Sequence, residues 1–230
     1  MVDPLEYVLP GFEWVHIPAA SADEGRAHQA AFKMGRFPIT NAQYEVFVEA
    51  DGYKDPAWWQ DLGLHPSSPR KSDWDESTAP KLQVCWFEAV GFTRWLSAVS
   101  GLAVRLPTAA EWRWAAVGDS GWSYLYGPEF DAQCCNMQDS GLDRTNDVMR
   151  YADVATHFGV VDMAGNVWEW MLESEDDTHP LNTTGDGRRI LCGGSWRAPA
   201  SQGAAGHHRP LSPRSRTYDI GFRIILDGSS

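Results

Sequence analysis

Helix-forming sequence ends early in this chain. Each segment that combines a capping residue with helically spaced apolar residues lies within residues 40–118 of the 230. After Gly118 the chain consists of short apolar pieces separated by Gly, Asn, Asp and Pro, which are typical of loops and short strands. This distribution predicts an α+β protein with few helices, short antiparallel strands and much irregular structure.

Three helices are predicted, each bounded by residues that commonly begin or end helices. Threonine followed three residues later by Gln or Glu forms a capping box, and glycine commonly follows the last helical residue. The first helix is capped by Thr40 and Gln43 and stopped by Gly52. The second covers residues 86–100 and is stopped by Gly101. The third is capped by Thr108 and Glu111 and stopped by Gly118.

Strands are expected at both ends of the sequence. The clearest are RRILCGGSW at 188–196 and GFRIIL at 221–226, and FEWVHIP at 12–18 shows a weaker alternation. Residues 55–80 show no sustained period and are expected to form a long surface excursion. Because the chain contains no repeat of 20 to 50 residues and has a length suited to one large domain, we expect residues 1–230 to form one domain.

The sequence predicts a soluble, cytoplasmic protein. No run approaches the roughly 20 apolar residues that cross a bilayer, and the opening MVDPLEYVLPG lacks the features of a signal peptide. The four cysteines form no CxxC pair, so reduced structural thiols are expected rather than disulfides or a zinc site.

Charge is distributed unevenly along the chain. The formal net charge of −12 argues against a nucleic-acid partner, because binding to phosphates depends on a basic surface. Seven arginines nevertheless lie between Arg188 and Arg223, together with His207 and His208, and Asp219 is the only acidic residue there. This local positive stretch favours anionic or acidic ligands.

Twelve tryptophans are distributed along the chain, several of them beside loops. Each has a large apolar ring to bury and an N–H that needs an acceptor. The sequence favours their use as core packing of a loop-rich fold over an aromatic ligand cage.

Four ordered motifs carry a family resemblance. GRFPITNAQYEVFVEADGY, VRLPTAAEWRWAA, FGVVDMAGNVWEW, and GGSW followed by IGFR resemble the formylglycine-generating enzyme, or sulfatase-modifying factor, family. The resemblance extends from about Phe32 to Leu226 and implies a variant of the C-type lectin fold.

Calcium is the cofactor that the resemblance implies. One set of ligands combines side-chain oxygens with backbone carbonyls, a mixture of hard oxygen donors that suits calcium. Hydrogen bonding within the turn is the alternative role for the same side chains. The implied residues are Asp162, Gly165, Val167 and Glu169 for the first site, and Asn136, Met137 and Asp139 for a second.

The enzymatic chemistry of the family is not expected here. The resemblance implies that the enzymes hold copper with two cysteines after the GGS turn, a soft-ligand site suited to Cu(I). The corresponding positions are Ala198 and Gly203, so copper is not expected. A related enzyme of ergothioneine biosynthesis holds iron in an additional helical domain, for which this chain has no room. The sequence therefore favours a non-catalytic protein, and a metal-dependent oxidase or other enzyme of the family is the alternative.

The C-terminal region also resembles the variable proteins of diversity-generating retroelements. Those proteins diversify a surface between a GGSW turn and a GFR strand, and randomised adenines of Asn codons there never produce Lys, Glu, Met, Trp or Gln. Residues 197–219 contain only Gln202 from that set. The resemblance implies a displayed surface that binds a protein or other macromolecule, because loops on a rigid scaffold tolerate change. Its candidate ligand-binding residues are Trp196, Arg197, Ala198, Pro199, Ser201, His207, His208, Arg209, Leu211, Arg214, Thr217 and Tyr218. Arg216 has a possible structural role instead, as the partner of an acidic neighbour.

Overall fold

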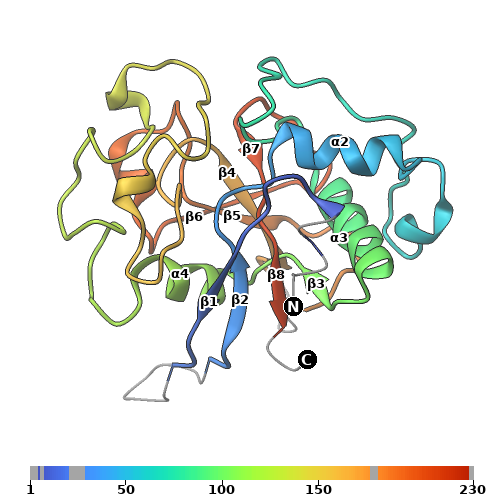
Figure 1. Cartoon of the computed structure of the whole chain (residues 1–230), viewed down its shortest axis with the longest axis horizontal. Coiled ribbons are helices and arrows are strands. Elements are labelled where there is room, and N and C mark those ends of the chain that lie inside the picture. Colours follow the sequence, from blue (N-terminus) through green and yellow to red (C-terminus); the bar gives the residue numbers. More distant parts are fainter. Residues whose placement is uncertain (1–4, 6–7, 21–28, 177–180, 228–230) are drawn as a thin grey trace.

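The computed structural model describes residue 5 and residues 8–20, 29–176 and 181–227. Its helices are short and its strands shorter, with long irregular connections between them (Figure 1). The elements in chain order are β1 (Trp14–Ile17), β2 (Phe32–Gly35), α2 (Asn41–Glu49), η1 (Pro56–Trp59), α3 (Trp86–Ser100), β3 (Val104–Arg105), α4 (Ala109–Val117), η2 (Gln138–Ser140), η3 (Ala152–Val154), β4 (Trp168–Ser174), β5 (Arg189–Cys192), η4 (Ala200–Gly203), β6 (His208–Leu211), β7 (Ile220–Gly221) and β8 (Ile225–Asp227).

Two four-stranded sheets organise the chain. The first has the order β1-β2-β8-β3, so that β8, from the C-terminal end of the sequence, lies between two strands from the first half. All its pairings are antiparallel. The second sheet has the order β6-β5-β4-β7, and only its β4–β7 pair is parallel. The predicted α+β class with short, mostly antiparallel strands is therefore confirmed.

The capping boxes predicted at Thr40 and Thr108 are both present. The C-terminal stop predicted for α3 is present too, with Gly101 in the left-handed conformation at φ +72°. The stop predicted at Gly52 is wrong by a few residues, because α2 ends at Glu49 and is capped by Ala50. Gly52 lies in the following turn, where a Cβ atom would overlap the ring of Phe47.

An aromatic core joins α2, α3 and the C-terminal segment. Phe92 stacks on Tyr44 and meets the ring of Phe222 edge to face, and Phe47 packs against Trp95. Buried tryptophans surround this cluster, and several indole N–H groups donate to backbone carbonyls. Aromatic packing thus replaces long regular elements as the main apolar contact of the fold.

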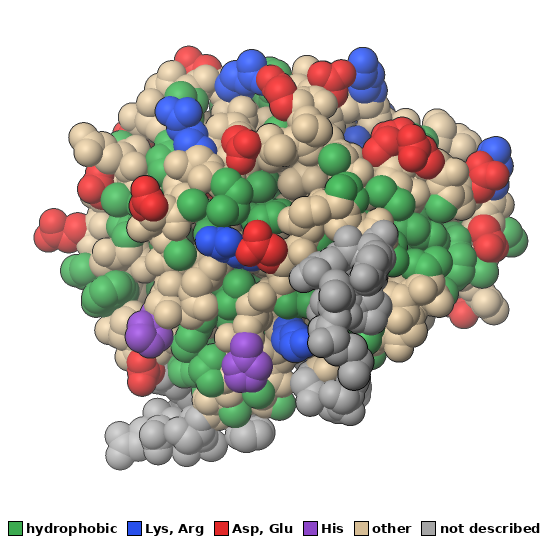
Figure 2. Space-filling view, viewed as in Figure 1, with side chains coloured by type: hydrophobic (Ala, Val, Ile, Leu, Met, Phe, Trp, Pro, Cys, Tyr) green, Lys and Arg blue, Asp and Glu red, His purple; other side chains and the backbone are tan. Residues whose placement is uncertain are grey.

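Surface charge follows the acidic composition. On the face shown in Figure 2, acidic side chains are scattered over the upper part and along both sides, with basic ones among them. The structure also contains polar networks that fix the positions of its elements.

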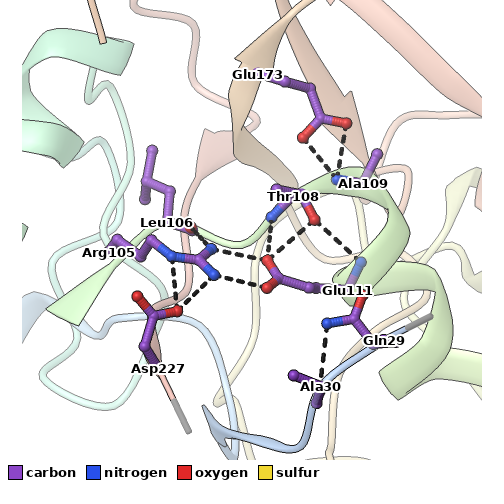
Figure 3. Close-up of polar contacts among 9 residues, drawn as sticks. All are labelled: Gln29, Ala30, Arg105, Leu106, Thr108, Ala109, Glu111, Glu173 and Asp227. Atoms are coloured by element: carbon purple, nitrogen blue, oxygen red, sulfur yellow. Dashed lines mark hydrogen bonds and ion pairs between the residues drawn. The ribbon is translucent and has the colours of Figure 1, made fainter. Parts of the chain in front are cut away.

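The start of α4 is held by a network of charged groups (Figure 3). Arg105 donates to both oxygens of Glu111 at 2.8 and 2.7 Å and to Asp227 of β8 at 2.9 and 2.6 Å. The backbone N–H of Ala109 donates to Glu173 of β4. Because bidentate arginine–carboxylate bonds are strong and directional, this network fixes α4 against both sheets.

Candidate ligand-binding site

The turn at Gly193 and Gly194 positions the first wall of the candidate site. Both glycines have positive φ, at +96° and +77°. A Cβ atom at Gly194 would lie 2.9 Å from Cε of Met137, and one at Gly193 would lie 3.2 Å from the ring of Trp112. Only glycine combines this conformation with such close packing. The backbone of the turn after β5 is therefore held in one conformation.

Asp219 joins this turn to the other end of residues 197–219, which we call the window. Its buried carboxylate accepts hydrogen bonds from Ser195 at 3.3 Å and from Thr217 at 2.6 Å. Its carbonyl accepts from the backbone N–H of Trp168 at the start of β4. The two ends of the window are therefore tied to each other and to the second sheet.

Arg216 and Arg214 attach the far part of the window to the rest of the protein. Nε of Arg216 lies 2.8 Å from Glu88 of α3, a carboxylate that is 1% exposed. The structural role suggested for Arg216 is thus observed. Arg214 lies over the ring of Phe87 and donates to Gly63 and Asp186. It therefore contacts the scaffold, and its contact with a ligand stays a prediction.

Two neighbouring pockets open at the window, with Arg197 and Tyr218 between them. The first, of about 260 Å³, is lined by Trp168, Ser195, Arg197, Ala198, Pro199, Gln202, Arg209, Thr217, Tyr218 and Asp219. The second, of about 350 Å³, is lined by Gln138, Asp143, Trp196, Arg197 and Tyr218.

The pockets bring together part of the predicted set of ligand-binding residues. Residues of that set that line neither pocket are Ser201, His207, His208, Leu211 and Arg214. Six further residues line the pockets although the sequence did not assign them to the ligand-binding set. Gln202 and Asp219 lie in the window, and Gln138, Asp143, Trp168 and Ser195 lie outside it.

Aromatic rings hold the arginines of the first pocket. The guanidinium of Arg197 lies 5.0 Å from the ring centre of Tyr218 and donates to its hydroxyl. The guanidinium of Arg209 lies 4.9 Å from the ring centre of Trp168, a cation–π distance. Burial lowers the pKa of Arg209, the negative charge of Asp219 opposes this shift, and the positive charge of Arg197 adds to it.

The two adjacent histidines occupy the edge of this region. His208 is exposed on β6, and His207 precedes it with its ring centre 6.0 Å from that of Trp168. Burial lowers the pKa of His207, so it is neutral at physiological pH. A group of three or more metal-binding His, Cys, Asp or Glu side chains is absent from the described part of the chain.

Glu169 of the implied calcium site is bound to protein groups. It is 1% exposed and accepts from Nε and Nη2 of Arg223 at 2.9 and 2.8 Å, and from the indole of Trp112 at 2.8 Å. The guanidinium therefore supplies the cation that a buried carboxylate requires.

Asp162 is the implied ligand with a free oxygen. Its Oδ2 accepts from Asn166, whereas its Oδ1 is buried with no hydrogen-bond partner among the described residues. Burial raises the pKa of Asp162 to about 8. The carbonyl of Gly165 accepts from the N–H of Val167.

The second implied site is also internally bonded. The amide of Asn136 donates to Arg144 and to the side chains of Asn146 and Asn166, and its oxygen accepts from Ser140. The carbonyl of Met137 accepts from the N–H of Ser140, and Asp139 lies in η2. Calcium takes six to eight oxygen ligands. Most oxygens of the two implied sites already accept hydrogen bonds from protein groups, so too few are free to coordinate the ion. Calcium stays a prediction from the resemblance.

The two positions that correspond to the copper-binding cysteines lie beside the first pocket. Ala198 is buried and lines that pocket. A Cβ atom at Gly203 would lie 2.3 Å from the sulfur of Met137, so the methionine side chain fills the space next to this position. The nearest cysteine in sequence, Cys192, is buried, and burial raises the pKa of its thiol.

Residues 12–228 match the family model of the sulfatase-modifying factor enzyme 1-like domain. The chain belongs to this family. Among the proteins to which the chain is similar, the serine/threonine-protein kinase pkn1 of Chlamydia caviae is 28% identical over 87% of this chain and 34% of that protein. Hercynine oxygenase of Mycolicibacterium smegmatis is 27% identical over 72% and 46%. The inactive C-alpha-formylglycine-generating enzyme 2 of Mus musculus is 24% identical over 96% and 85%. The chain thus spans only about a third to a half of the first two relatives.

Solved structures establish the fold of this family member. Treponema denticola variable protein 1 superposes with a TM-score of 0.69 at 21% identity, covering 94% of this chain and 95% of that one. CarF gives a TM-score of 0.72 at 23% identity, covering 95% and 99%. PvdO from Pseudomonas aeruginosa gives 0.72 at 21%, covering 93% and 94%. The expected C-type lectin-like fold, shared with variable proteins, is confirmed.

Proposed function

We propose that this protein is a non-catalytic ligand-binding member of the sulfatase-modifying factor family. It forms one domain over residues 1–230 and displays the window, residues 197–219, to a protein or other macromolecular ligand. The observation that carries the proposal is the pair of pockets that share Arg197 and Tyr218, because they lie on a segment tied to the scaffold at Asp219 and Arg216. A rigid frame around accessible side chains is the arrangement that binding loops require.

Two further features support binding rather than catalysis. The positions of the copper-binding cysteines carry Ala198 and Gly203, and Met137 occupies the space beside the second. A mouse relative carries the name of an inactive formylglycine-generating enzyme. An oxidase function would need another redox centre.

Diversification of the window is part of the proposal. Its composition, with Gln202 as the one residue that adenine randomisation would not produce, supports this origin. The likeness in fold to Treponema denticola variable protein 1 is consistent with it.

The reduced thiols agree with a cytoplasmic location. Within the described residues, the helices are all too short or too polar to span a bilayer.

Sequencing this gene across its source population tests the proposal. We expect substitutions to concentrate at codons 197–219 and to spare the flanking 193–196 and 220–223. The matched control is the segment 86–100, which forms the buried helix α3. A window as invariant as α3 would overturn diversification and would favour a fixed partner or reaction.

A further inference from the structure

Several arginines among the described residues form an ion pair with a carboxylate. The two that line the smaller pocket do not. Arg197 donates to the hydroxyl of Tyr218 rather than to a carboxylate, and Nε of Arg209 is buried with no hydrogen-bond partner among the described residues. The arginines that form ion pairs elsewhere are Arg36, Arg105, Arg144, Arg188, Arg214, Arg216 and Arg223.

The buried Nε of Arg209 indicates an absent acceptor. A charged donor removed from water without an acceptor loses its hydration with no compensating bond. The aromatic face of Trp168 offsets part of this cost. A hydrogen-bond acceptor entering the pocket would offset the remainder.

Other charged groups near the pocket set its net charge. Asp219 is in the pocket wall, 5% exposed, and its oxygens already accept from Ser195 and Thr217. In the lining of the smaller pocket two guanidiniums therefore face one carboxylate, an excess of one positive charge. Asp143 lines only the adjoining pocket, on the other side of Arg197 and Tyr218. His207 lies next to the pocket residue Trp168, and its lowered pKa leaves it uncharged at physiological pH.

We propose that the pocket between Arg197 and Arg209 binds the carboxylate of an aspartate or glutamate side chain of a protein ligand, an inference that rests on the proposed display function. An excess of one positive charge matches a singly charged carboxylate. A carboxylate also accepts two parallel N–H bonds from a guanidinium.

Size and long-range charge favour this ligand over other anions. The pocket volume of about 260 Å³ lies below the range of pockets for drug-sized ligands, so it fits one side chain. A polyanion such as a nucleic acid would meet the repulsion of a body with net charge −12. The partly exposed aromatic rings of Trp196 and Tyr218 at the rim provide the apolar contact area common at protein interfaces.

The test is an NMR titration of the full-length, ¹⁵N-labelled protein with N-acetyl-glutamate amide, and with N-acetyl-glutamine amide as its neutral counterpart. We expect the acidic compound to shift the Nε–H signal of Arg209 in a saturable manner, and the neutral one not to. Arg209→Gln and Arg197→Gln each weaken binding roughly tenfold or more, because each removes charge-assisted hydrogen bonds.

Two variants control for general effects of charge and folding. Arg113→Gln removes an exposed positive charge on α4 and leaves the affinity unchanged. Arg197→Lys keeps the charge but loses the planar fork, so it binds more weakly than the wild type and more tightly than Arg197→Gln. The backbone amide spectrum of each variant shows whether the fold is intact.

Three outcomes would overturn the proposal. They are the absence of a shift at Arg209 up to about 100 mM acidic compound, equal affinity for the neutral compound, and tighter binding of inorganic phosphate than of the carboxylate. If one of these occurs while population sequencing shows a diversified window, the carboxylate site is wrong and the display function stands. If the carboxylate binds as expected in a protein whose window is invariant, the site is real and diversification of the window is wrong.

Discussion

Arg223 and Glu169 form an ion pair in which both side chains are almost completely removed from water, at 0% and 1% exposure. The same guanidinium also donates to the carbonyls of Gly35 and Val161, so one side chain connects β2, β4 and the loop before β4. This pair lies where the family resemblance implied a calcium ligand.

Breaking this pair is expected to destabilise the protein strongly. Arg223→Met leaves the Glu169 carboxylate buried without a cation, which costs about 3–5 kcal/mol of the free energy of unfolding. The control is Arg36→Met, which removes a partly exposed pair with Glu13 and costs about 0–1 kcal/mol. Urea denaturation measures both. Equal effects of the two substitutions would contradict the assignment.

Calcium is expected to change thermal stability by less than about 2 °C, since both carboxylate oxygens of Glu169 at the first implied site are hydrogen-bonded and one of the two on Asp162 is free. The measurement compares Tm in calcium chloride with Tm in a chelator. A larger rise that disappears in Asp162→Asn would show that the loop rearranges to bind the ion, and would restore the ligand set predicted from the resemblance.

Lys81 is expected to make stability increase between about pH 8 and pH 10. Burial lowers its pKa to about 8 in the folded protein, against an ordinary pKa of 10.5 for lysine. In that interval the unfolded chain binds a proton at Lys81 and the folded chain does not, so raising the pH favours folding by up to about 1.4 kcal/mol per unit.

The Lys81 prediction is checked by the difference between the wild type and Lys81→Met. The methionine has a similar shape and no titrating group, so subtracting its pH profile removes the contribution of other residues. A wild-type profile parallel to that of the variant would show that Lys81 titrates near its ordinary pKa.

Gly165 is expected to tolerate no side chain. It has φ +79°, and a Cβ atom would lie 2.2 Å from the carbonyl oxygen of Asn136. Gly165→Ala therefore combines backbone strain with a clash against backbone and costs about 3 kcal/mol or more. Gly141→Ala, at φ +68° with open space around it, costs about 1 kcal/mol. Comparable Tm values for the two variants would contradict the packing described at Asn136.

Local sequence patterns predicted the helices better than the site. Thr40, Thr108 and Gly101 act within a few residues of themselves, so their capping roles follow from short-range sequence. The end of α2 was misplaced at Gly52 because Asp51, with φ +58°, takes the left-handed conformation that commonly follows a helix, and Gly52 comes one residue later.

The site depends on contacts between distant segments, which no local pattern records. Gln138 and Trp168 line the pockets, although neither lies in the window. Arg214 carries the same charge as Arg209 and also lies in the window, yet it forms an ion pair with Asp186 on the scaffold.

The sequence by itself determined the α+β class, the capped helices, the family motifs and the absence of cysteine at positions 198 and 203, because these depend on residue type and short-range spacing. Tertiary structure alone decided which arginine guanidiniums have no carboxylate partner and which buried carboxylate is paired with a guanidinium. The physical reason is that charge pairing depends on distances between side chains far apart in sequence, as for Arg223 and Glu169, and those distances are set only when the two sheets and the aromatic core pack together.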